Sequence, residues 1–198
     1  MFVSFEGLDG SGKSTQAELL RSRLEAEGEN VLATREPGGT ELGEAIRELV
    51  LHGGTVEPWA EALLYAAARA QLVAEVVRPA LERGSTVLCD RYVDSSVAYQ
   101  GVARGLGLQR VLDLNLAAVD GLMPDRTFLL LIDADEVEKR LDADRDRLER
   151  ESDRFHSCVD AGYRELASRF PERIVALDGS LARDELADEV YGALRERS

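Results

Sequence analysis

The sequence predicts an α/β protein in which a parallel sheet is flanked by helices. Short β-branched and apolar runs alternate with long helical patterns, and this alternation is typical of parallel sheets with helical crossovers. The short runs are apolar throughout, as expected for strands that helices cover on both faces. Five strands are predicted, enough for one open sheet, at residues 2–5, 31–34, 86–89, 127–132 and 174–177.

Helical patterns occupy the segments between and after the predicted strands. Residues 14–27 have a helix-forming composition and end before Gly28, which favours a helix end. Residues 57–83 are the most apolar helical region, so we expect a buried helix, with Pro79 marking a break. Residues 136–169 are helical again, but the charged stretch 139–154 indicates a mobile, solvent-facing segment flanked by helices. Residues 182–197 indicate a closing helix.

Length and composition favour one domain spanning residues 1–198 and exclude several classes of protein. The 198 residues are 44% hydrophobic, enough for a substantial core. The formal net charge of −14 argues against an extended nucleic-acid-binding surface, which needs a basic balance. Cys89 and Cys158 lack a CxxC pairing and neighbouring histidines, so neither a disulfide framework nor a zinc site is predicted. Without a basic signal segment or an apolar run near ~18 residues, we expect a cytoplasmic protein that does not enter a membrane.

The strongest motif lies between the first predicted strand and the first predicted helix. Residues 7–14 read GLDGSGKS and match the phosphate-loop pattern GxxxxGK[ST] in the context that its mechanism requires. The glycines let backbone N–H groups surround a phosphate chain, and the helix N-terminus adds positive potential. Lys13 is expected to reach the β- and γ-phosphates of ATP, and Ser14 to bind Mg²⁺. The predicted cofactor-binding residues are Gly7, Leu8, Asp9, Gly10, Ser11, Gly12, Lys13, Ser14 and Thr15.

Kinases, switch GTPases and motors all carry this loop, so other residues must decide among them. A switch GTPase would carry a guanine-reading NKxD-like segment, and neither Asn30 nor Asn115 is followed by Lys-x-Asp. A kinase needs a second anion pocket and cations around the transferred group. Arg35, Arg69 and Arg91 are candidates for these cations, so a kinase is favoured.

Five segments jointly resemble the bacterial thymidylate kinases. They are EGLDGSGKST at 6–15, TREPGGT at 34–40, YAAARAQL at 65–72, DRYVDSSVAYQG at 90–101 and DRLERE at 146–151. Their order and spacing match that family from Phe2 to about Leu177. The resemblance implies a three-layer phosphate-loop NTPase fold and a nucleoside monophosphate kinase that moves the γ-phosphoryl group of MgATP onto dTMP, in dTTP biosynthesis. It also implies a homodimer, for which the apolar helix at 57–77 would be suited.

The resemblance assigns roles around the reacting phosphates. Asp9 corresponds to the carboxylate that meets the deoxyribose 3′-hydroxyl, and Arg91 to the arginine that grips the dTMP phosphate. An arginine fork can hold a phosphate bidentately while sharing the charge of the passing phosphoryl group. Asp90, which follows an apolar strand, is where a Mg²⁺-binding or catalytic carboxylate would lie. TREPGGT supplies a further arginine for the acceptor phosphate and two residues that shape its loop, namely Arg35, Glu36 and Pro37.

The resemblance also assigns the residues that recognise the acceptor nucleoside. Arg69 corresponds to the arginine that donates to thymine O4, and Tyr65, four residues earlier on the same helical face, to the ring that stacks on the base. Ser96 lies where the family reads thymine N3, and Tyr99 where a ring crowds any 2′-hydroxyl. Gln100 is expected beside the sugar and the base.

The resemblance makes the charged stretch 139–154 a short helical lid, and an arginine of this lid is expected to supply the remaining positive charge. Some members of the family carry an arginine inside the phosphate loop, where this chain has Gly10. Closure of the lid would also exclude water that could otherwise hydrolyse ATP. Arg145 and Arg147 are the predicted catalytic arginines of a lid that also contains Arg140 and Arg150.

Two other hypotheses fit the sequence. The same fold could phosphorylate another nucleotide or a nucleoside, in which case Arg69 would not set base selectivity. Alternatively, the short acidic lid could belong to a catalytically silent nucleotide-binding module.

Overall fold

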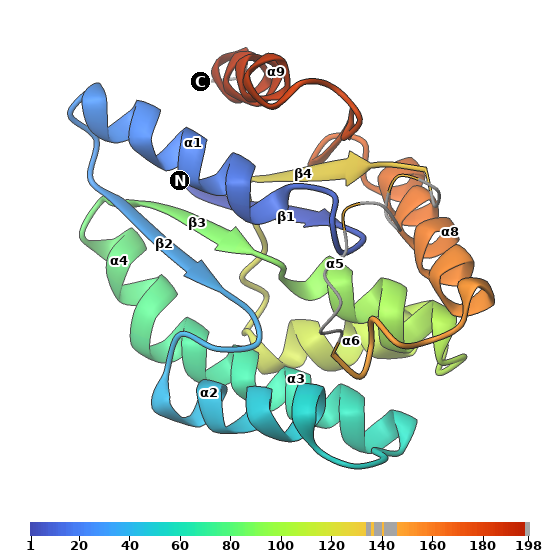
Figure 1. Cartoon of the computed structure of the whole chain (residues 1–198). Helices are drawn as coiled ribbons and strands as arrows, with labels where there is room; N and C mark the ends of the chain where they lie inside the picture. The colour runs from blue at the N-terminus through green and yellow to red at the C-terminus, as the bar shows by residue number, and fades with distance from the viewer. Residues whose placement is uncertain (134–135, 137–139, 141–145, 197–198) are drawn as a thin grey trace.

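A computed structural model shows five parallel strands that form one sheet (Figure 1). It describes residues 1–133, 136, 140 and 146–196. The strand order is β2-β3-β1-β4-β5, so the first strand is central, and each neighbouring pair is parallel. The five predicted strands are confirmed, with slightly different ends, as β1 (Phe2–Gly7), β2 (Val31–Arg35), β3 (Thr86–Asp90), β4 (Arg126–Leu131) and β5 (Ile174–Asp178).

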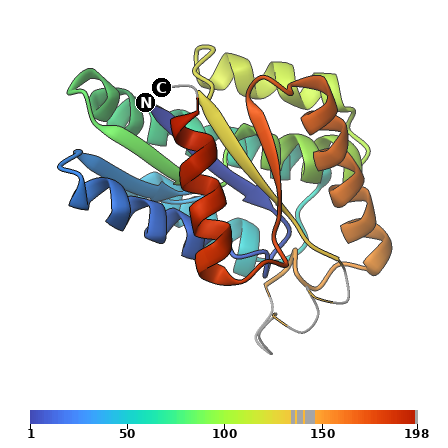
Figure 2. The same ribbon diagram turned by 90° about the horizontal axis from the view of Figure 1, so that it is seen from above.

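Helices cover both faces of the sheet and so make three layers (Figures 1 and 2). On one face, α1 (Lys13–Ala26) packs beside α9 (Arg183–Arg195). The opposite side carries α2 (Glu41–Arg47), η1 (Glu48–His52), α3 (Pro58–Leu72), η2 (Val73–Val77), α4 (Arg78–Glu82), α5 (Val93–Ser96), η3 (Val97–Ala103), α6 (Leu108–Ala118) and α8 (Asp153–Arg169), in which the η segments are π-helical. The α/β class and the three-layer architecture are therefore confirmed.

The alternation of β1 decides which side chains reach each face of the sheet. Val3 and Phe5 join the core beneath α1 and α9, whereas Phe2 joins the core of the opposite side. Because a strand has a period of two, Ser4 and Glu6 point the same way as Phe2. Both are polar and fully buried, so each needs a hydrogen-bonding partner inside the protein.

The carboxyl ends of β1 and β3 meet at one edge of the sheet. Phe5 is in register with Asp90, and the backbone N–H of Arg91 donates to the Phe5 carbonyl at 2.9 Å. The loop that follows β1 therefore lies beside the residues that follow β3. Open parallel sheets bind their ligands at this edge, outside the carboxyl ends of the strands.

The predicted helix at 57–83 is buried on one side, but Pro79 does not end it. The chain continues as α3, η2 and α4, and Pro79 lies in the first turn of α4. Pro79 has no N–H to donate, and the wider π-helical turn at Val73–Val77 directly before it changes the hydrogen-bond register there. The expected break is thus replaced by a local change of helix type.

Three helical stretches lie where the sequence analysis predicts no element. The first is α2 with η1, and the Thr40 hydroxyl caps it by accepting a hydrogen bond from the Gly43 N–H at 3.0 Å. The second is α5 with η3, and the third is α6, which packs against α3, α5 and η3. None of the helices within the described ranges is long and apolar enough to cross a bilayer.

The end of the predicted lid faces solvent at Arg150 and at residues 152–154, but it is anchored to the fold at Leu148. Within the described residues 146–154, Leu148 is buried with 8% of its surface exposed, and α8 begins only at Asp153. The backbone N–H of Arg147 donates to the Leu51 carbonyl at 3.1 Å, which fixes this turn to η1. Residues 139 and 141–145 of the predicted lid lie outside the described residues.

Candidate active site

The loop between β1 and α1 has the conformation that a phosphate cradle requires. Gly12 precedes the helix with a left-handed backbone (φ 92°), and Gly7 has φ 138°. A Cβ atom at Gly7 would lie 2.9 Å from the Ser11 hydroxyl and would also meet the Leu130 carbonyl, so only glycine fits there. The loop places the N-terminus of the 14-residue helix α1 at the edge of the sheet, where it favours anions.

Lys13 lies within this loop rather than in solvent. Its ammonium group donates to the Leu8 carbonyl at 2.7 Å and is 3.8 Å from the Asp9 carboxylate. Burial and the nearby Arg91 lower the pKa of Lys13, while Asp9 opposes the shift. Because a phosphate chain would bring negative charge to this amine, binding of the chain would favour the charged form.

Ser14 and Asp90 bring two oxygen ligands together at the same edge. The Ser14 hydroxyl donates to Oδ2 of Asp90, which links the start of α1 to the end of β3. A hydroxyl and a carboxylate are hard oxygen donors, which fit Mg²⁺. Among the described residues no group of three or more His, Cys, Asp or Glu could hold a metal, so a magnesium ion here would also need phosphate and water oxygens.

Arg91 reaches back to the phosphate loop, where it contacts Gly7 and Asp9. Its backbone is left-handed (φ 68°), which is uncommon outside glycine. One terminal nitrogen donates to the carbonyl of Gly7 at 3.1 Å, and the other forms an ion pair with Asp9. Burial opposes the charge of Arg91, but Asp9 holds the pKa of Arg91 well above its ordinary value. Burial likewise opposes the charge of Asp9, yet Arg91 and Lys13 hold the pKa of Asp9 below its usual range.

Two cavities meet at Arg91. The phosphate-loop cavity has a volume of about 410 Å³ and is lined by Gly10, Gly12, Lys13, Ser14, Thr15 and Asp90 among others. The tyrosine cavity has a volume of about 150 Å³ and is lined by Tyr65, Arg69, Ser96, Tyr99 and Gln100 among others. Five residues line both, namely Asp9, Glu36, Arg47, Arg91 and Glu149. Two ligands bound in these cavities would therefore face each other across Arg91 and Asp9.

A third cavity extends the phosphate-loop cavity toward α9. The two share Gly10, Gly12, Thr15 and Arg140, and the third adds Ser11 and the apolar side chains of Leu181 and Leu186. The predicted loop residues Gly7 and Leu8 support the loop from within the fold, since Leu8 is buried and its carbonyl holds Lys13.

The family model described as thymidylate kinase matches residues 5–190 of the chain, and this range includes every residue named in the cavities above. The chain belongs to the thymidylate kinase family. Curated thymidylate kinases are similar to it along almost their whole length. The protein from Clavibacter sepedonicus is 53% identical over 96% of this chain and 92% of its own. The protein from Deinococcus radiodurans is 48% identical over 100% of this chain and 97% of its own.

A solved thymidylate kinase also has the same fold. The crystal structure of thymidylate kinase from Ehrlichia chaffeensis superimposes with a TM-score of 0.83 at 32% sequence identity. The superposition covers 98% of this chain and 98% of that one. The phosphate-loop NTPase architecture that the sequence predicts is thus shared with an experimental member of the thymidylate kinase family.

The side chains that the family resemblance assigns to the nucleoside converge on the tyrosine cavity. Tyr65 on α3 and Tyr99 on η3 line it together with Ser96 and Gln100. The Tyr99 hydroxyl donates to Asp9 at 3.3 Å, and the Gln100 amide donates to Glu61 at 2.8 Å. Burial raises the pKa values of both tyrosines, so their hydroxyls stay neutral donors near neutral pH.

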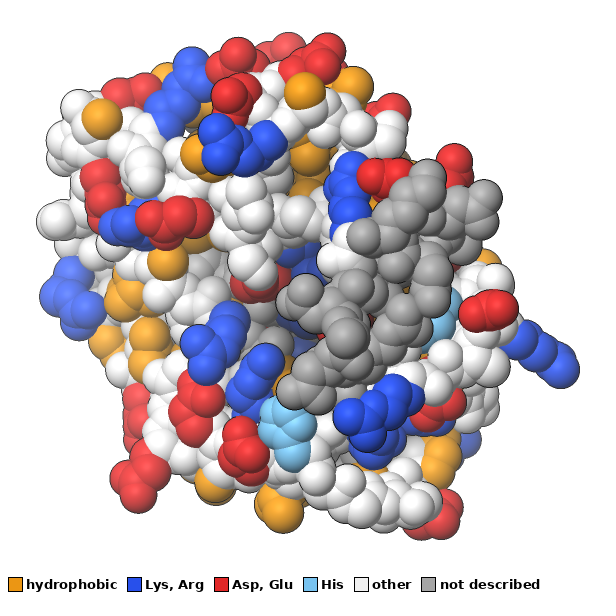
Figure 3. All heavy atoms as spheres, in the orientation of Figure 1, with side chains coloured by type: hydrophobic (Ala, Val, Ile, Leu, Met, Phe, Trp, Pro, Cys, Tyr) orange, Lys and Arg blue, Asp and Glu red, His pale blue; other side chains and the backbone are white. Residues whose placement is uncertain are grey.

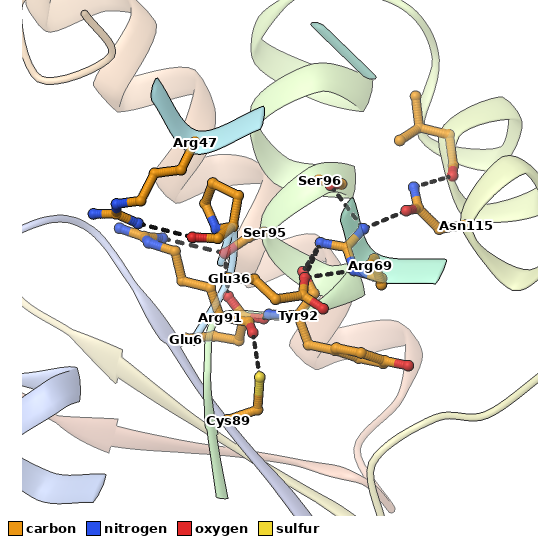
Figure 4. A network of polar contacts seen from close by, with 12 residues as sticks. Glu6, Glu36, Arg47, Arg69, Cys89, Arg91, Tyr92, Ser95, Ser96 and Asn115 are labelled. Carbon is orange, nitrogen blue, oxygen red and sulfur yellow. Dashed lines mark hydrogen bonds and ion pairs between the residues drawn. The ribbon is translucent and has the colours of Figure 1, made fainter. Parts of the chain in front are cut away.

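Arg69 lines the tyrosine cavity but is itself buried, with 1% of its surface exposed. Its guanidinium donates to Glu36 at 2.6 Å, to Ser96 at 3.0 Å, to the Tyr92 carbonyl at 2.9 Å and also to Asn115 (Figure 4). All three of its nitrogens thus have protein partners, and a base carbonyl would have to share or replace one of them. Burial raises the pKa of Glu36 to about 7 against the opposing charge of Arg69.

Arg35 and Arg47 lie at the phosphate-loop cavity, but only Arg47 also lines the tyrosine cavity. Arg35 lines the phosphate-loop cavity, where it pairs with Glu44 at 3.1 Å with about half of its side chain exposed, 56%. Arg47, which sequence analysis missed, lines both cavities and donates to the Pro37 carbonyl at 3.0 Å. The cation that reaches the junction of the cavities from this side is therefore Arg47, supported by the loop of Glu36 and Pro37.

Of the two predicted catalytic arginines of the lid, only Arg147 lies within the described residues. Arg145 lies outside the described residues. Arg147 donates to the Val50 carbonyl at 2.7 Å and to the buried Glu61 at 2.5 Å, and it lines neither cavity. Arg140 instead lines the phosphate-loop cavity and the third cavity, where it donates to the Gly179 carbonyl at 3.1 Å. Sequence spacing alone could not separate these arginines, because their orientation depends on contacts with η1, α3 and the loop after β5.

Proposed function

We propose that the protein transfers the γ-phosphoryl group of ATP to dTMP. The observation that carries this proposal is the meeting of the phosphate-loop cavity and the tyrosine cavity at Arg91 and Asp9. A phosphoryl transfer needs donor and acceptor phosphates side by side, with cations between them and water kept out. The membership of the chain in the thymidylate kinase family supports the choice of acceptor. We infer that residues 1–198 act as one domain.

On the donor side, the phosphates of ATP would lie in the phosphate loop. Backbone N–H groups of the loop and the N-terminus of α1 would hold them, and Lys13 would neutralise the β- and γ-phosphates. The nucleoside would extend into the third cavity, between Arg140 and the apolar side chains of Leu181 and Leu186. Arg140 lines both the phosphate-loop cavity and the third cavity, so it would be a further cation for the phosphate chain.

Ser14 and Asp90 would hold Mg²⁺, which would neutralise part of the phosphate charge when bound. Their hydrogen bond places both oxygens at the rim of the phosphate-loop cavity, and Asp90 lines that cavity at the end of β3. The residues need no rearrangement of the backbone to present both oxygens together, since β1 and β3 are neighbours in the sheet.

On the acceptor side, dTMP would lie in the tyrosine cavity with its phosphate toward Arg91. Tyr65 would stack on the base, while Arg69 and Ser96 would meet its polar edge. Tyr99 would crowd a ribose 2′-hydroxyl, Asp9 would meet the 3′-hydroxyl, and Gln100 would lie beside the sugar. Arg91 and Arg47 would then hold the acceptor phosphate at the junction, and Arg91 would share the charge of the transferred group.

This arrangement needs no general base, because the dTMP phosphate is already an anionic nucleophile near neutral pH. The protein's own contribution would be alignment and stabilisation of charge, which together account for most of the catalysis in phosphoryl transfer. Asp146, Leu148 and Glu149 line the tyrosine cavity from the lid side, so they would help to exclude water from it.

A coupled ADP-release assay with MgATP and dTMP, dUMP, dCMP, AMP or GMP as acceptor tests the proposal. We expect dTMP to give the highest kcat/KM, and Arg91→Lys to lower it because a lysine cannot bridge two phosphates in a fork. Arg83→Lys on the far end of α4 serves as the matched control and should behave as the wild type. Equal rates with all five acceptors, or preference for another one, would contradict dTMP as the substrate.

We also propose a homodimer formed through α2, η1 and α3. The exposed large apolar side chains include Leu42, Leu49, Trp59 and Leu63, all on these three elements. Trp59 and Leu63 lie one turn apart and so share one side of α3.

Sedimentation tests the homodimer. The wild type should sediment with twice the mass of one chain, and Leu63→Glu should shift the protein toward the mass of one chain. A wild type that sediments as one chain excludes the dimer.

A further inference from the structure

A fully buried carboxylate lies behind Arg91, outside both cavities. Glu6 has no exposed surface and projects from β1 toward α5 and α8. Oε1 of Glu6 accepts the Tyr92 N–H at 2.7 Å, and Oε2 accepts the hydroxyls of Ser95 at 2.5 Å and Tyr163 at 2.9 Å. Glu6 thus binds the residue next to Arg91 in the chain and two hydroxyls from separate helices.

The same two hydroxyls accept hydrogen bonds from Arg91. Its Nη1, whose two hydrogens are shared among three acceptors, lies 3.1 Å from the Ser95 hydroxyl, 3.2 Å from the Tyr163 hydroxyl and 3.1 Å from the Gly7 carbonyl. A guanidinium can only donate, so a hydroxyl that is bonded to Arg91 accepts from it and directs its own hydrogen elsewhere. Glu6 is the acceptor that both hydroxyls reach, and the hydroxyls lie 2.9 Å from each other, so the four side chains form one connected group.

We infer that Glu6 and Tyr163 are positioning residues that fix the Arg91 guanidinium at the junction of the two cavities. The inference rests on the proposed function, in which Arg91 joins the acceptor phosphate to the transferred group. Glu6 sets the direction of both hydroxyls, and its bond to Tyr92 holds the left-handed turn from which Arg91 projects. Tyr163 contacts the same guanidinium from α8, although it lies more than seventy residues after Arg91 in the chain.

A glutamine at position 6 would have nearly the same size as Glu6, but it would replace one acceptor oxygen with an N–H donor. If its amide nitrogen faced Ser95 and Tyr163, it would donate to hydroxyls that already accept from Arg91, leaving their hydrogens without this acceptor. If it faced Tyr92 instead, two N–H donors would oppose each other. The first orientation takes the fixed pair of acceptors from the guanidinium, and the second releases the turn at Tyr92 from which Arg91 projects.

The chain contains a matched control pair on its outer surface. The Tyr191 hydroxyl donates to Glu27 at 2.6 Å, and Glu27 also pairs with an arginine, Arg195. This tyrosine–glutamate–arginine group lies between α1 and α9 and lines none of the three cavities described above. Glu27→Gln and Tyr191→Phe therefore make the same chemical changes away from Arg91.

The experiment measures kcat and KM for dTMP and for ATP in Glu6→Gln, Tyr163→Phe, their double variant and the two controls, with circular dichroism to check folding. We expect kcat/KM for dTMP to fall about ten- to hundredfold in Glu6→Gln and Tyr163→Phe, as small misplacements of catalytic groups do. The KM for ATP should stay unchanged, the double variant should lose little more than Glu6→Gln, and the controls should match the wild type. Tyr163→Phe is nearly isosteric, so it carries the test if Glu6→Gln fails to fold.

The same substitutions are then made in an Arg91→Lys background. If Glu6 and Tyr163 act through Arg91, they should have little further effect there, because the group that they position is gone. Losses of equal size in both backgrounds, or normal kinetics for both single variants, would overturn the inference while leaving dTMP phosphorylation intact. A wild type without activity on dTMP would overturn both the inference and the proposed function on which it rests.

Discussion

The charges at the junction of the two cavities are arranged as an alternating group. Lys13, Asp9 and Arg91 follow one another, with the Asp9 carboxylate between the two cations. Away from water, removing one charge of such a group leaves its partner buried and unpaired. The resulting loss of stability is much larger than the small contribution of an ion pair at the surface. The arrangement therefore keeps two cations at the reacting edge of a protein whose net charge is −14.

The carboxyl of Glu6 makes stability depend on pH. Burial and the nearby Asp94 raise the pKa of Glu6 from 4.5 to about 7, so the folded protein binds a proton that the unfolded chain lacks between those values. This stabilising contribution is fully present below pH 4.5 and is lost as the pH rises through about 7. A glutamine at this position has no such contribution.

Urea unfolding of the wild type and Glu6→Gln at about pH 5 and about pH 8 measures the effect. The free energy of unfolding of the wild type minus that of the variant should be larger at the lower pH. Within the window its slope should reach up to about 1.4 kcal/mol per pH unit. Glu36, whose pKa burial also raises to about 7, is present in both proteins and cancels from the difference. A difference that is constant, or that grows toward higher pH, would contradict the raised pKa of Glu6.

Residues within contiguous motifs were predictable from the sequence, but their supports were not. The phosphate loop can be recognised in the sequence because its backbone conformation requires glycines at fixed positions. Glu6 reads only as a polar residue within a buried strand, and Tyr163 as one aromatic residue of an amphipathic helix. Their relation to Arg91 depends on three elements meeting in space, which spacing along the chain does not encode.

Helix α8 packs unusually closely on η3, and this contact positions Tyr163. A Cβ atom added at Gly162 would lie 3.1 Å from the Cα of Ala98 and 3.2 Å from two atoms of Val102. Backbone and β-branched groups cannot move aside easily, so α8 would have to shift. Gly162→Ala should lower the free energy of unfolding by about 1–3 kcal/mol.

Gly192→Ala on α9 is the control for this prediction, since a Cβ atom there would meet nothing within 4 Å. Alanine is the better helix former, so this variant should be more stable by about 0.5–1 kcal/mol. Chemical denaturation of both variants gives the comparison. An alanine at position 162 that is as well tolerated as the one at 192 would show that the α8–η3 contact can relax.

At the scale of elements, strands were easier to predict than helices. The five strands are short apolar runs because helices cover both faces of the sheet, and this burial leaves a clear signal. Helix α2 begins with a single threonine cap and is followed by the π-helical η1, so neither periodicity nor length marks the pair. Pro79 predicts a helix break that does not occur. The π-helical turn at Val73–Val77 changes the hydrogen-bond register before Pro79, so the chain continues as a helix.

The acidic excess distinguishes the molecule as a whole. On the face in Figure 3, acidic and basic side chains of the described residues are interspersed. Many of the ion pairs are exposed, such as Arg21 with Glu18 and Arg169 with Glu165, and each of these contributes little to stability. We therefore expect long-range repulsion among the excess carboxylates to outweigh these exposed pairs in the electrostatics of folding.

Salt should accordingly stabilise the protein. We expect the thermal unfolding midpoint to rise between low and moderate NaCl, up to ionic strengths at which the Debye length falls to about 3 Å. KCl should act alike if screening is the cause, whereas an effect of one cation alone would indicate specific binding. A midpoint that falls with salt would mean that the ion pairs outweigh the net repulsion.

The shared wall between the two cavities has a consequence for inhibition. Asp9, Glu36, Arg47, Arg91 and Glu149 line both spaces. A single molecule with a nucleoside at each end of a polyphosphate tether could occupy both halves at once. Once one end had docked, the other would arrive at high effective concentration, and tether length would determine how much affinity is gained. The residues shared by the two cavities thus also set the tether length that a ligand resembling both substrates would need.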